Sequence, residues 1–178
     1  MFEREIDGCR LILKQGDITE QDTDAVVNAA NKRLAPGGGV AGAIHRAAGK
    51  QLWEHCKDSG GCETGEAVIT PGFNLEAPHI IHTVGPVYSQ HPQPEEALQK
   101  SYVNSLRLAN KKNIESISFP ALSTGAFGYP LAEAAIVSLN AIISFLSEEK
   151  GALNEVRLVL YSEGEYEVFK ETANKILN

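Results

Sequence analysis

Three consecutive glycines, Gly37 to Gly39, separate a polar turn from an alanine-rich segment in the stretch NAANKRLAPGGGVAGAIHRAAG. Glycine lets the backbone approach a ligand closely and turn its N–H groups toward one point. A helix that begins there adds a partial positive charge at its N-terminus. Because the apolar residues Val26 and Val27 precede this stretch, the pattern is that of a strand, a loop and a helix. It predicts a site that holds a phosphate.

A second loop of the same kind has the sequence STGAFG, Ser123 to Gly128, and lies between the apolar run SISFP and Pro130. Successive backbone N–H groups in such a turn can form an anion-binding nest. Two facing nests would suit a diphosphate, although either loop alone is equally well explained as a tight turn that needs small residues. Neither loop matches the Gly-Lys-Ser/Thr pattern of a P-loop or the GxGxxG pattern of dinucleotide-binding folds.

Five polar or aromatic side chains near these loops have two interpretations each. Asp17 follows a glycine after an apolar run, so it could cap a turn or accept a hydrogen bond from an exocyclic amine. Tyr161 could stack on a base or be a rim aromatic, and Phe127 could anchor its loop or pack against a sugar. Of Asn28 and Asn31, one amide is expected to tie the turn together while the other faces a ligand hydroxyl.

Metal and nucleophile chemistry is poorly supported by the sequence. His79 and His82 are three residues apart on a predicted strand, so their side chains point to opposite faces. His55, Cys56 and Cys62 lack a convincing ligand spacing and a fourth ligand. No serine stands in a GxSxG motif. We expect neither a metal ion nor an organic cofactor.

Apolar runs that resemble strands alternate along the chain with helical patterns. This alternation predicts an α/β fold with a largely parallel central sheet, helices on both faces and an antiparallel edge formed by the early strands. Ligands of such folds lie at the carboxyl ends of the parallel strands. The predicted strands are Arg10 to Lys14, Ala25 to Asn28, Ala67 to Thr70, His79 to Val84, Ser116 to Phe119 and Val156 to Tyr161; the predicted helices are Val40 to Lys57, Pro94 to Lys112, Leu131 to Glu149 and Gly164 to Leu177.

Composition narrows the class of protein further. A chain of 178 residues with 43% hydrophobic residues suits one globular domain over residues 1–178, expected to be a monomer. The net charge of -7 argues against extended contacts with nucleic acid but leaves room for one small anionic ligand. Three cysteines that form no CxxC pair indicate free thiols, and no apolar run approaches the ~20 residues of a membrane span. We therefore expect a cytoplasmic protein without a membrane partner.

The motifs together closely resemble the macrodomain family, and its MacroD-type branch in particular. The resemblance runs in order from Leu11 to Tyr161, and it implies a three-layer α/β/α sandwich with a central mixed, mostly parallel sheet. The motifs that carry it are Gly16 to Thr19 (GDIT), Asn28 to Asn31 (NAAN), Gly37 to Gly49 (GGGVAGAIHRAAG), Gly61 to Ala67 (GCETGEA), Ile81 to Pro86 (IHTVGP) and Phe119 to Gly128 (FPALSTGAFG).

The resemblance implies that the chain binds ADP-ribose, free or attached to a protein, and hydrolyses ADP-ribose esters, either protein mono-ADP-ribosyl groups or O-acetyl-ADP-ribose. Asp17 would hold the adenine amino group, Tyr161 would pack on the ring, and Asn31 with Phe127 would contact the distal ribose. Asn31 and Gly38 are the catalytic candidates, and Asn28 looks more structural. The implied ADP-ribose-binding residues are Asp17, Ile18, Asn31, Gly37, Gly38, Gly39, Val40, Ser123, Thr124, Gly125, Ala126, Phe127 and Tyr161.

One position departs from the pattern of the MacroD-type hydrolases. Their sequence GGVDGAIH carries an aspartate thought to position or activate water, and Ala41 stands there in this chain. A histidine that some other branches place before the glycines is also absent, since Ala35 and Pro36 occupy those positions. Two alternatives to a hydrolase therefore stay open: a binding module that does not turn ADP-ribose over, and a phosphatase acting on ADP-ribose 1″-phosphate.

Overall fold

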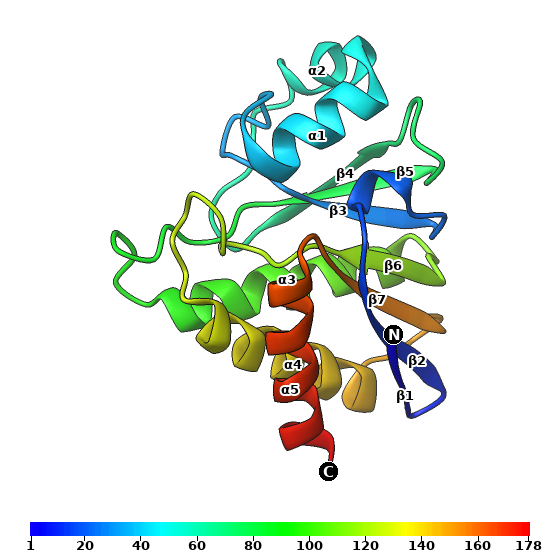
Figure 1. Ribbon diagram of the computed structural model, residues 1–178. Coiled ribbons are helices and arrows are strands. Elements are labelled where there is room, and N and C mark those ends of the chain that lie inside the picture. The colour runs from blue at the N-terminus through cyan, green and yellow to red at the C-terminus, as the bar shows by residue number, and fades with distance from the viewer.

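The computed structural model describes all of residues 1–178 and contains seven strands, five α-helices and one short 3₁₀ helix (Figure 1). Alternating strands and helices follow one another from β3 onward, as the sequence pattern predicts. The strands are β1 (Phe2–Ile6), β2 (Cys9–Gln15), β3 (Ala25–Ala29), β4 (Ala67–Pro71), β5 (His79–Thr83), β6 (Ser116–Phe119) and β7 (Glu155–Leu160). The helices are η1 (Ile18–Glu20), α1 (Gly39–Ala48), α2 (Lys50–Cys56), α3 (Pro94–Lys111), α4 (Leu131–Glu148) and α5 (Glu163–Leu177).

All seven strands form one sheet in the order β1-β2-β7-β6-β3-β5-β4. The five central strands pair in parallel, and the two outer strands, β1 and β4, pair antiparallel to their neighbours. The parallel arrangement brings the carboxyl ends of β2, β3, β6 and β7 to one edge of the sheet. The predicted mixed, mostly parallel sheet is confirmed.

Two groups of helices cover the two faces of the sheet (Figure 1). Helices α3, α4 and α5 pack on one face around a core of 29 buried residues that includes Tyr102, Phe119 and Phe169. Helices α1 and α2 pack on the other face around a smaller core of 13 residues, with Ile44 and Leu52 fully buried. The molecule is therefore a three-layer α/β/α sandwich.

An antiparallel edge near the N-terminus is present as predicted, but the strand that forms it was not predicted. It is made by β1, whose charged residues Glu3 to Glu5 are exposed, while the predicted early strand β2 pairs in parallel with β7. The turn between β1 and β2 is Asp7-Gly8, with φ of 47° and 86°. Asp-Gly at positive φ is the hairpin signal that sequence reasoning overlooked. A second antiparallel edge, β4, was also not predicted.

The predicted helix Val40 to Lys57 is broken into two by Gly49. This residue has φ of 93°, a backbone conformation that favours glycine, and its N–H bonds to the carbonyl of His45 to end α1. Helix α4 differs from expectation in another way. By length and composition alone it could cross a membrane. In the structure α4 lies between α3 and α5, and its apolar side packs into the larger core.

Candidate functional site

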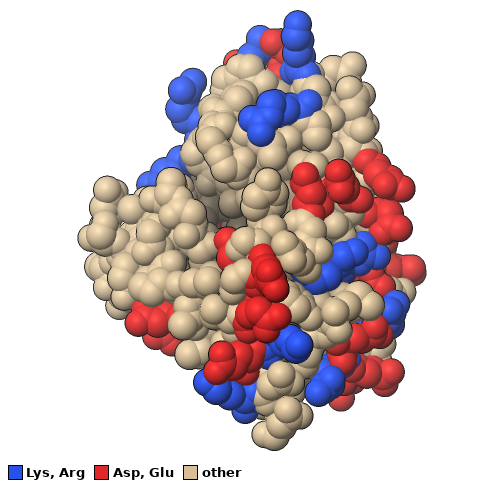
Figure 2. Space-filling view, viewed as in Figure 1, with Lys and Arg blue, Asp and Glu red and all other residues tan.

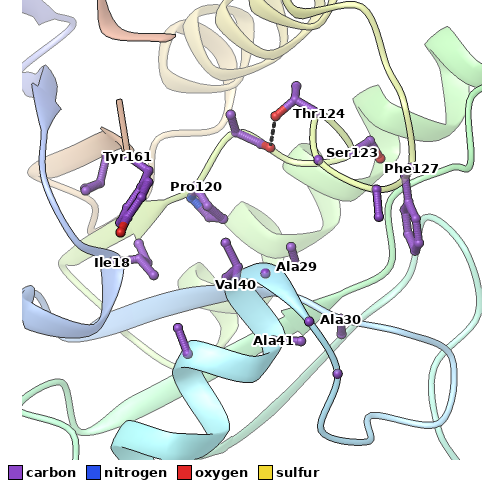
Figure 3. A pocket seen from close by; sticks show the side chains of 18 of the residues that line it. Ile18, Ala29, Ala30, Val40, Ala41, Pro120, Ser123, Thr124, Phe127 and Tyr161 are labelled. Atoms are coloured by element: carbon purple, nitrogen blue, oxygen red, sulfur yellow. Dashed lines mark hydrogen bonds between the residues drawn. The ribbon is translucent and has the colours of Figure 1, made fainter. Parts of the chain in front are cut away.

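A cavity of about 710 Å³ opens at the edge of the sheet where the parallel strands end. This volume lies within the range of small-molecule sites. Four loops line it: Gly16 to Ile18 after β2, Ala30 to Gly38 after β3, Pro120 to Phe127 after β6, and Tyr161 after β7. All thirteen residues predicted to bind a ligand lie in its wall. Figure 3 shows Tyr161 and Phe127 at opposite ends.

The glycine loop leaves a set of backbone donors free beside this cavity. Helix α1 begins at Gly39, and its N-cap Gly38 has no side chain to satisfy the first turn. The N–H groups of Gly38 to Ala41 donate to no protein acceptor, and these residues line the cavity. The first N–H groups of a helix are unpaired unless a cap, water or ligand accepts from them. The start of α1 is thus a site suited to an anion.

Two contacts fix the shape of this loop. The Asn31 side chain donates from Nδ2 to the Ala35 carbonyl at 2.8 Å and accepts at Oδ1 from the Ala35 N–H at 2.9 Å. A Cβ at Gly42 would lie only 2.3 Å from the Gly37 carbonyl oxygen, so the loop can approach α1 only because residue 42 is glycine. Asn31 is therefore the amide that ties the turn, while one Nδ2 hydrogen stays free for the cavity it lines.

The second loop also presents unpaired donors. Tyr129 N–H bonds to the Ser123 carbonyl and Gly128 N–H to the Gly125 carbonyl, but the N–H groups of Gly125, Ala126 and Phe127 have no protein acceptor. Thr124 Oγ1 donates to the Ala121 carbonyl at 2.8 Å, the dashed line in Figure 3. Three free N–H groups on a cavity wall opposite those of α1 provide the second half of a site for a diphosphate.

Asp17 caps a turn and also has an oxygen free to accept a hydrogen bond, so it can have both of the roles that the sequence left open. Its Oδ1 accepts from Thr19 N at 2.8 Å and from Thr19 Oγ1 at 2.7 Å, which caps η1. Its second oxygen has no partner in the protein, and the residue lines the cavity. One carboxylate thus holds the loop and still offers an acceptor beside Ile18.

Tyr161 forms the wall opposite Ile18 at this end of the cavity (Figure 3). The residue is 79% exposed, so its ring is available as a flat apolar surface. Its backbone N–H donates to Glu165 Oε2 at 3.0 Å, and Ser162 caps α5 by accepting from Glu165 N–H at 3.1 Å. The side chains of Ser162 and Glu165 form a capping box at the start of α5.

Asn28 lies outside the cavity, in the sheet beneath the glycine loop. Its Nδ2 contacts His82 Nδ1 at 3.1 Å, and His82 Nε2 contacts Thr70 Oγ1 at 2.9 Å. Since an amide Nδ2 can only donate, the ring accepts at Nδ1 and donates from Nε2. Burial lowers the pKa of His82 to about 3, so the ring is neutral. Asn28 is a structural residue that joins β3 to β5.

Ionisable side chains are few along the cavity wall. Asp17, Arg46, Tyr161 and Glu165 are the only ones among the 23 lining residues, and none is a histidine. Ala41 lies in the wall at the start of α1 (Figure 3), 6% exposed. No group of three or more His, Cys, Asp or Glu residues is placed to hold a metal ion anywhere in the molecule.

Sequence reasoning missed part of the cavity wall. Arg46 stands three residues after Ala43, so helical spacing places the two on the same face of α1. Glu165, which belongs to the capping box of α5, was not predicted as a lining residue. The others are small or apolar residues next to predicted ones, which carry no chemical signal: Gly16, Ala29, Ala30, Ala43, Pro120, Ala121 and Val159, besides Ala41.

An α/β/α sandwich with a ligand cavity at the carboxyl ends of its parallel strands defines a class of protein, and comparison of the sequence with known families identifies this class. Residues 27–138 match the Macro domain family model. A macro domain-containing protein of Methanosarcina mazei is 47% identical over 99% of this chain and 93% of its own length. The chain belongs to the macro domain family.

Named relatives and solved structures add detail. The ADP-ribose glycohydrolase MACROD2 of Xenopus laevis is 43% identical over 90% of this chain, which corresponds to 39% of that longer protein. The Oceanobacillus iheyensis macrodomain with ADP is 42% identical, covers 99% of this chain and 96% of its own, and superimposes with a TM-score of 0.95. A Trypanosoma brucei macrodomain in complex with ADP-ribose is 42% identical, with a TM-score of 0.86 over 90% of this chain and 68% of its own.

Proposed function

We propose that this chain binds ADP-ribose and slowly hydrolyses ADP-ribose esters, on proteins or as O-acetyl-ADP-ribose. The observation that carries the proposal is the cavity with free backbone donors on two facing walls and an apolar slot at one end. Its support from comparison is the family itself, a relative named ADP-ribose glycohydrolase, and similar structures that hold ADP or ADP-ribose.

The chemistry of ADP-ribose matches the cavity from end to end. Adenine fits between Ile18 and the Tyr161 ring, with its amino group donating to the free oxygen of Asp17. The diphosphate accepts from the N–H groups of α1 and of the loop Ser123 to Gly128. The distal ribose then lies between Asn31 and Phe127, which both line the cavity; Phe127 lies at the end away from Tyr161 (Figure 3).

Hydrolysis at that end has to proceed without a protein base, because Ala41 and its neighbours supply none. In the mechanism we propose, a water held between the glycine loop and a substrate phosphate attacks the distal ribose carbon that carries the ester. The bond from this carbon to the carboxyl oxygen breaks, the carboxylate of the modified side chain leaves, and a phosphate oxygen accepts the proton of the water. Asn31 orients the sugar. Positioning of this kind contributes as much as general-base catalysis in many reactions.

Two measurements test binding and turnover separately. Calorimetry with ADP-ribose should give saturable binding that is weakened by Asn31→Ala and by Gly38→Glu; an affinity unchanged by both substitutions would refute the placement of the site. Single-turnover release of ADP-ribose from a glutamate-modified protein should exceed the rate in buffer. No release above buffer over hours would refute the hydrolase.

The second candidate function, a binding module without turnover, is favoured by Ala41. Ala41→Asp tests it directly, because Ala41 lines the cavity in the first turn of α1, where the helix dipole favours a carboxylate. If a missing carboxylate limits a hydrolase, turnover should rise several-fold while the affinity for ADP-ribose stays similar. Ala41→Asn is the matched control, of the same size without the base. Binding with no release in either variant would identify a binding module.

A further inference from the structure

The two carboxylates of the cavity lie at the same end. Asp17 and Glu165 are the only acidic residues that line it, and β2 and β7, which precede them, are joined by a hydrogen bond from Gly16 N–H to the Leu160 carbonyl at 2.9 Å. Acidic side chains gather over α5 on one side of the hollow in Figure 2, and basic ones lie over α1 on the other side. The cavity is therefore electrostatically polar along its length.

Glu165 is held in place by the backbone of the loop that carries Tyr161. Its Oε2 accepts from Tyr161 N–H at 3.0 Å and from Ser162 N–H at 3.4 Å. Its other oxygen, Oε1, has no hydrogen-bond partner in the protein. These two N–H groups precede α5 and would otherwise attract an anion. The carboxylate of Glu165 occupies this position and presents a free acceptor to the cavity instead.

The region beside the glycine loop carries the opposite charge. Arg46 is the only cation that lines the cavity, it forms no ion pair, and its Nη1 lies 3.0 Å from the position of a Cβ on Gly42, beside the glycine loop. The free N–H groups of α1 start nearby. An anionic part of a ligand is stabilised there, and a neutral part with hydroxyl donors fits at the Glu165 end.

We infer that Glu165 makes this cavity select a nucleoside whose ribose carries free hydroxyls and reject one that is phosphorylated on that ribose. The inference rests on the proposed binding of ADP-ribose, with adenine against Tyr161. The ribose next to the base then lies between Tyr161 and the diphosphate loops, within reach of Glu165. A carboxylate accepts from a ribose hydroxyl, as acidic residues do in dinucleotide-binding folds, and repels a phosphate at the same position.

The test compares ADP-ribose with ADP-ribose 2′-phosphate by calorimetry at low ionic strength. For the unmodified chain we expect the 2′-phosphorylated ligand to bind about tenfold more weakly, the effect of like charges about 5 Å apart near solvent. Glu165→Gln should reduce this ratio several-fold, because the amide keeps an acceptor for the Tyr161 N–H but has no charge. Raising the salt concentration should shrink the ratio for the unmodified chain.

Glu163→Gln is the matched control, since Glu163 is an exposed acid in the same first turn of α5 that does not line the cavity. It should leave the ratio of the two affinities unchanged. Equal affinity of the unmodified chain for both ligands would overturn the inference, and so would a ratio that Glu165→Gln does not alter. Failure of the unmodified chain to bind ADP-ribose at all would instead refute the proposed function.

Discussion

The two ends of the cavity are built in different ways. At the Tyr161 end the wall consists of side chains with specific chemistry: an aromatic ring, two carboxylates and the apolar Ile18. At the glycine-loop end the wall consists mostly of backbone N–H groups, with Ala41 where a carboxylate could stand. Side chains can distinguish one base from another, whereas backbone donors bind any anion of the right shape. With ADP-ribose bound as proposed, selectivity for the base and its ribose lies at the Tyr161 end, and the backbone donors beside the glycine loop hold the diphosphate.

The largest effect is expected from blocking the backbone end. A Cβ at Gly38 meets nothing within 4 Å, and its backbone lies in a region open to all residues, with φ of -89°. Gly38→Glu should therefore fold normally but place a negative side chain over the free N–H groups. We expect the affinity for ADP-ribose to fall about 100-fold, equivalent to about 2.7 kcal/mol, with little change in Tm.

The control for this substitution is Gly164→Glu, which adds the same side chain near the start of α5, where the nearest atom to a Cβ is Ser162 Oγ at 3.9 Å. It should leave the affinity for ADP-ribose unchanged. If Gly38→Glu lowered the Tm strongly, the loop would be essential for folding. The loss of affinity would then not show that the backbone N–H groups bind the ligand.

A second effect concerns the sheet beneath the glycine-loop end. The pKa of His82 is lowered to about 3 by burial, whereas in the unfolded chain it is near 6.5. The unfolded state therefore binds a proton that the folded state does not between these values, and stability falls as the pH falls from 6.5 toward 3. Burial also lowers the pKa of His45, which acts in the same direction.

Urea unfolding at pH 7, 6 and 5 measures this loss. From His82 alone we expect the free energy of unfolding to decrease by about 2 kcal/mol between pH 7 and pH 5. His82→Gln should be less stable at pH 7, because a buried hydrogen-bond network is altered, but should lose less stability on acidification. Parallel pH dependences of the two proteins would show that His82 is not the titrating group.

The sequence predicted part of the cavity wall at the Tyr161 end and part of it beside the glycine loop. The glycine loop, the STGAFG loop and Tyr161 were found because glycine clusters and an aromatic at a strand end are strong local signals. Glu165 and Arg46 were missed because their role depends on where a helix side chain points after the chain has folded. Similarly, β1 was not predicted because its central residues, Glu3 to Glu5, are charged. An edge strand needs little apolar surface, so it lacks the apolar pattern of a buried strand.

Backbone geometry accounts for the remaining differences. The break between α1 and α2 depends on the positive φ of Gly49, and a single glycine in a long helical pattern is also compatible with one continuous helix. The pairing of β4 with β5 could not be predicted either, because the direction of an edge strand is set by its connection rather than by its composition. Local patterns therefore predicted most of the helices and strands and most of the site. The pairing of the edge strands of the sheet depends on tertiary contacts that these patterns do not contain.

The smallest of the expected effects separates the two roles of Asp17 at the Tyr161 end. Asp17→Ala removes both the cap of η1 and the free acceptor, so we expect a loss of about 1 kcal/mol of stability and about tenfold in affinity for ADP-ribose. Asp17→Asn keeps an oxygen to accept from Thr19 N–H but turns an N–H₂ toward the cavity. Its stability should stay near that of the unmodified chain, measured by urea unfolding, while its affinity falls as far as that of Asp17→Ala, measured by calorimetry. An Asp17→Asn protein that binds ADP-ribose normally would mean that this carboxylate serves the loop alone, and selectivity at this end would then depend on Tyr161 and Glu165.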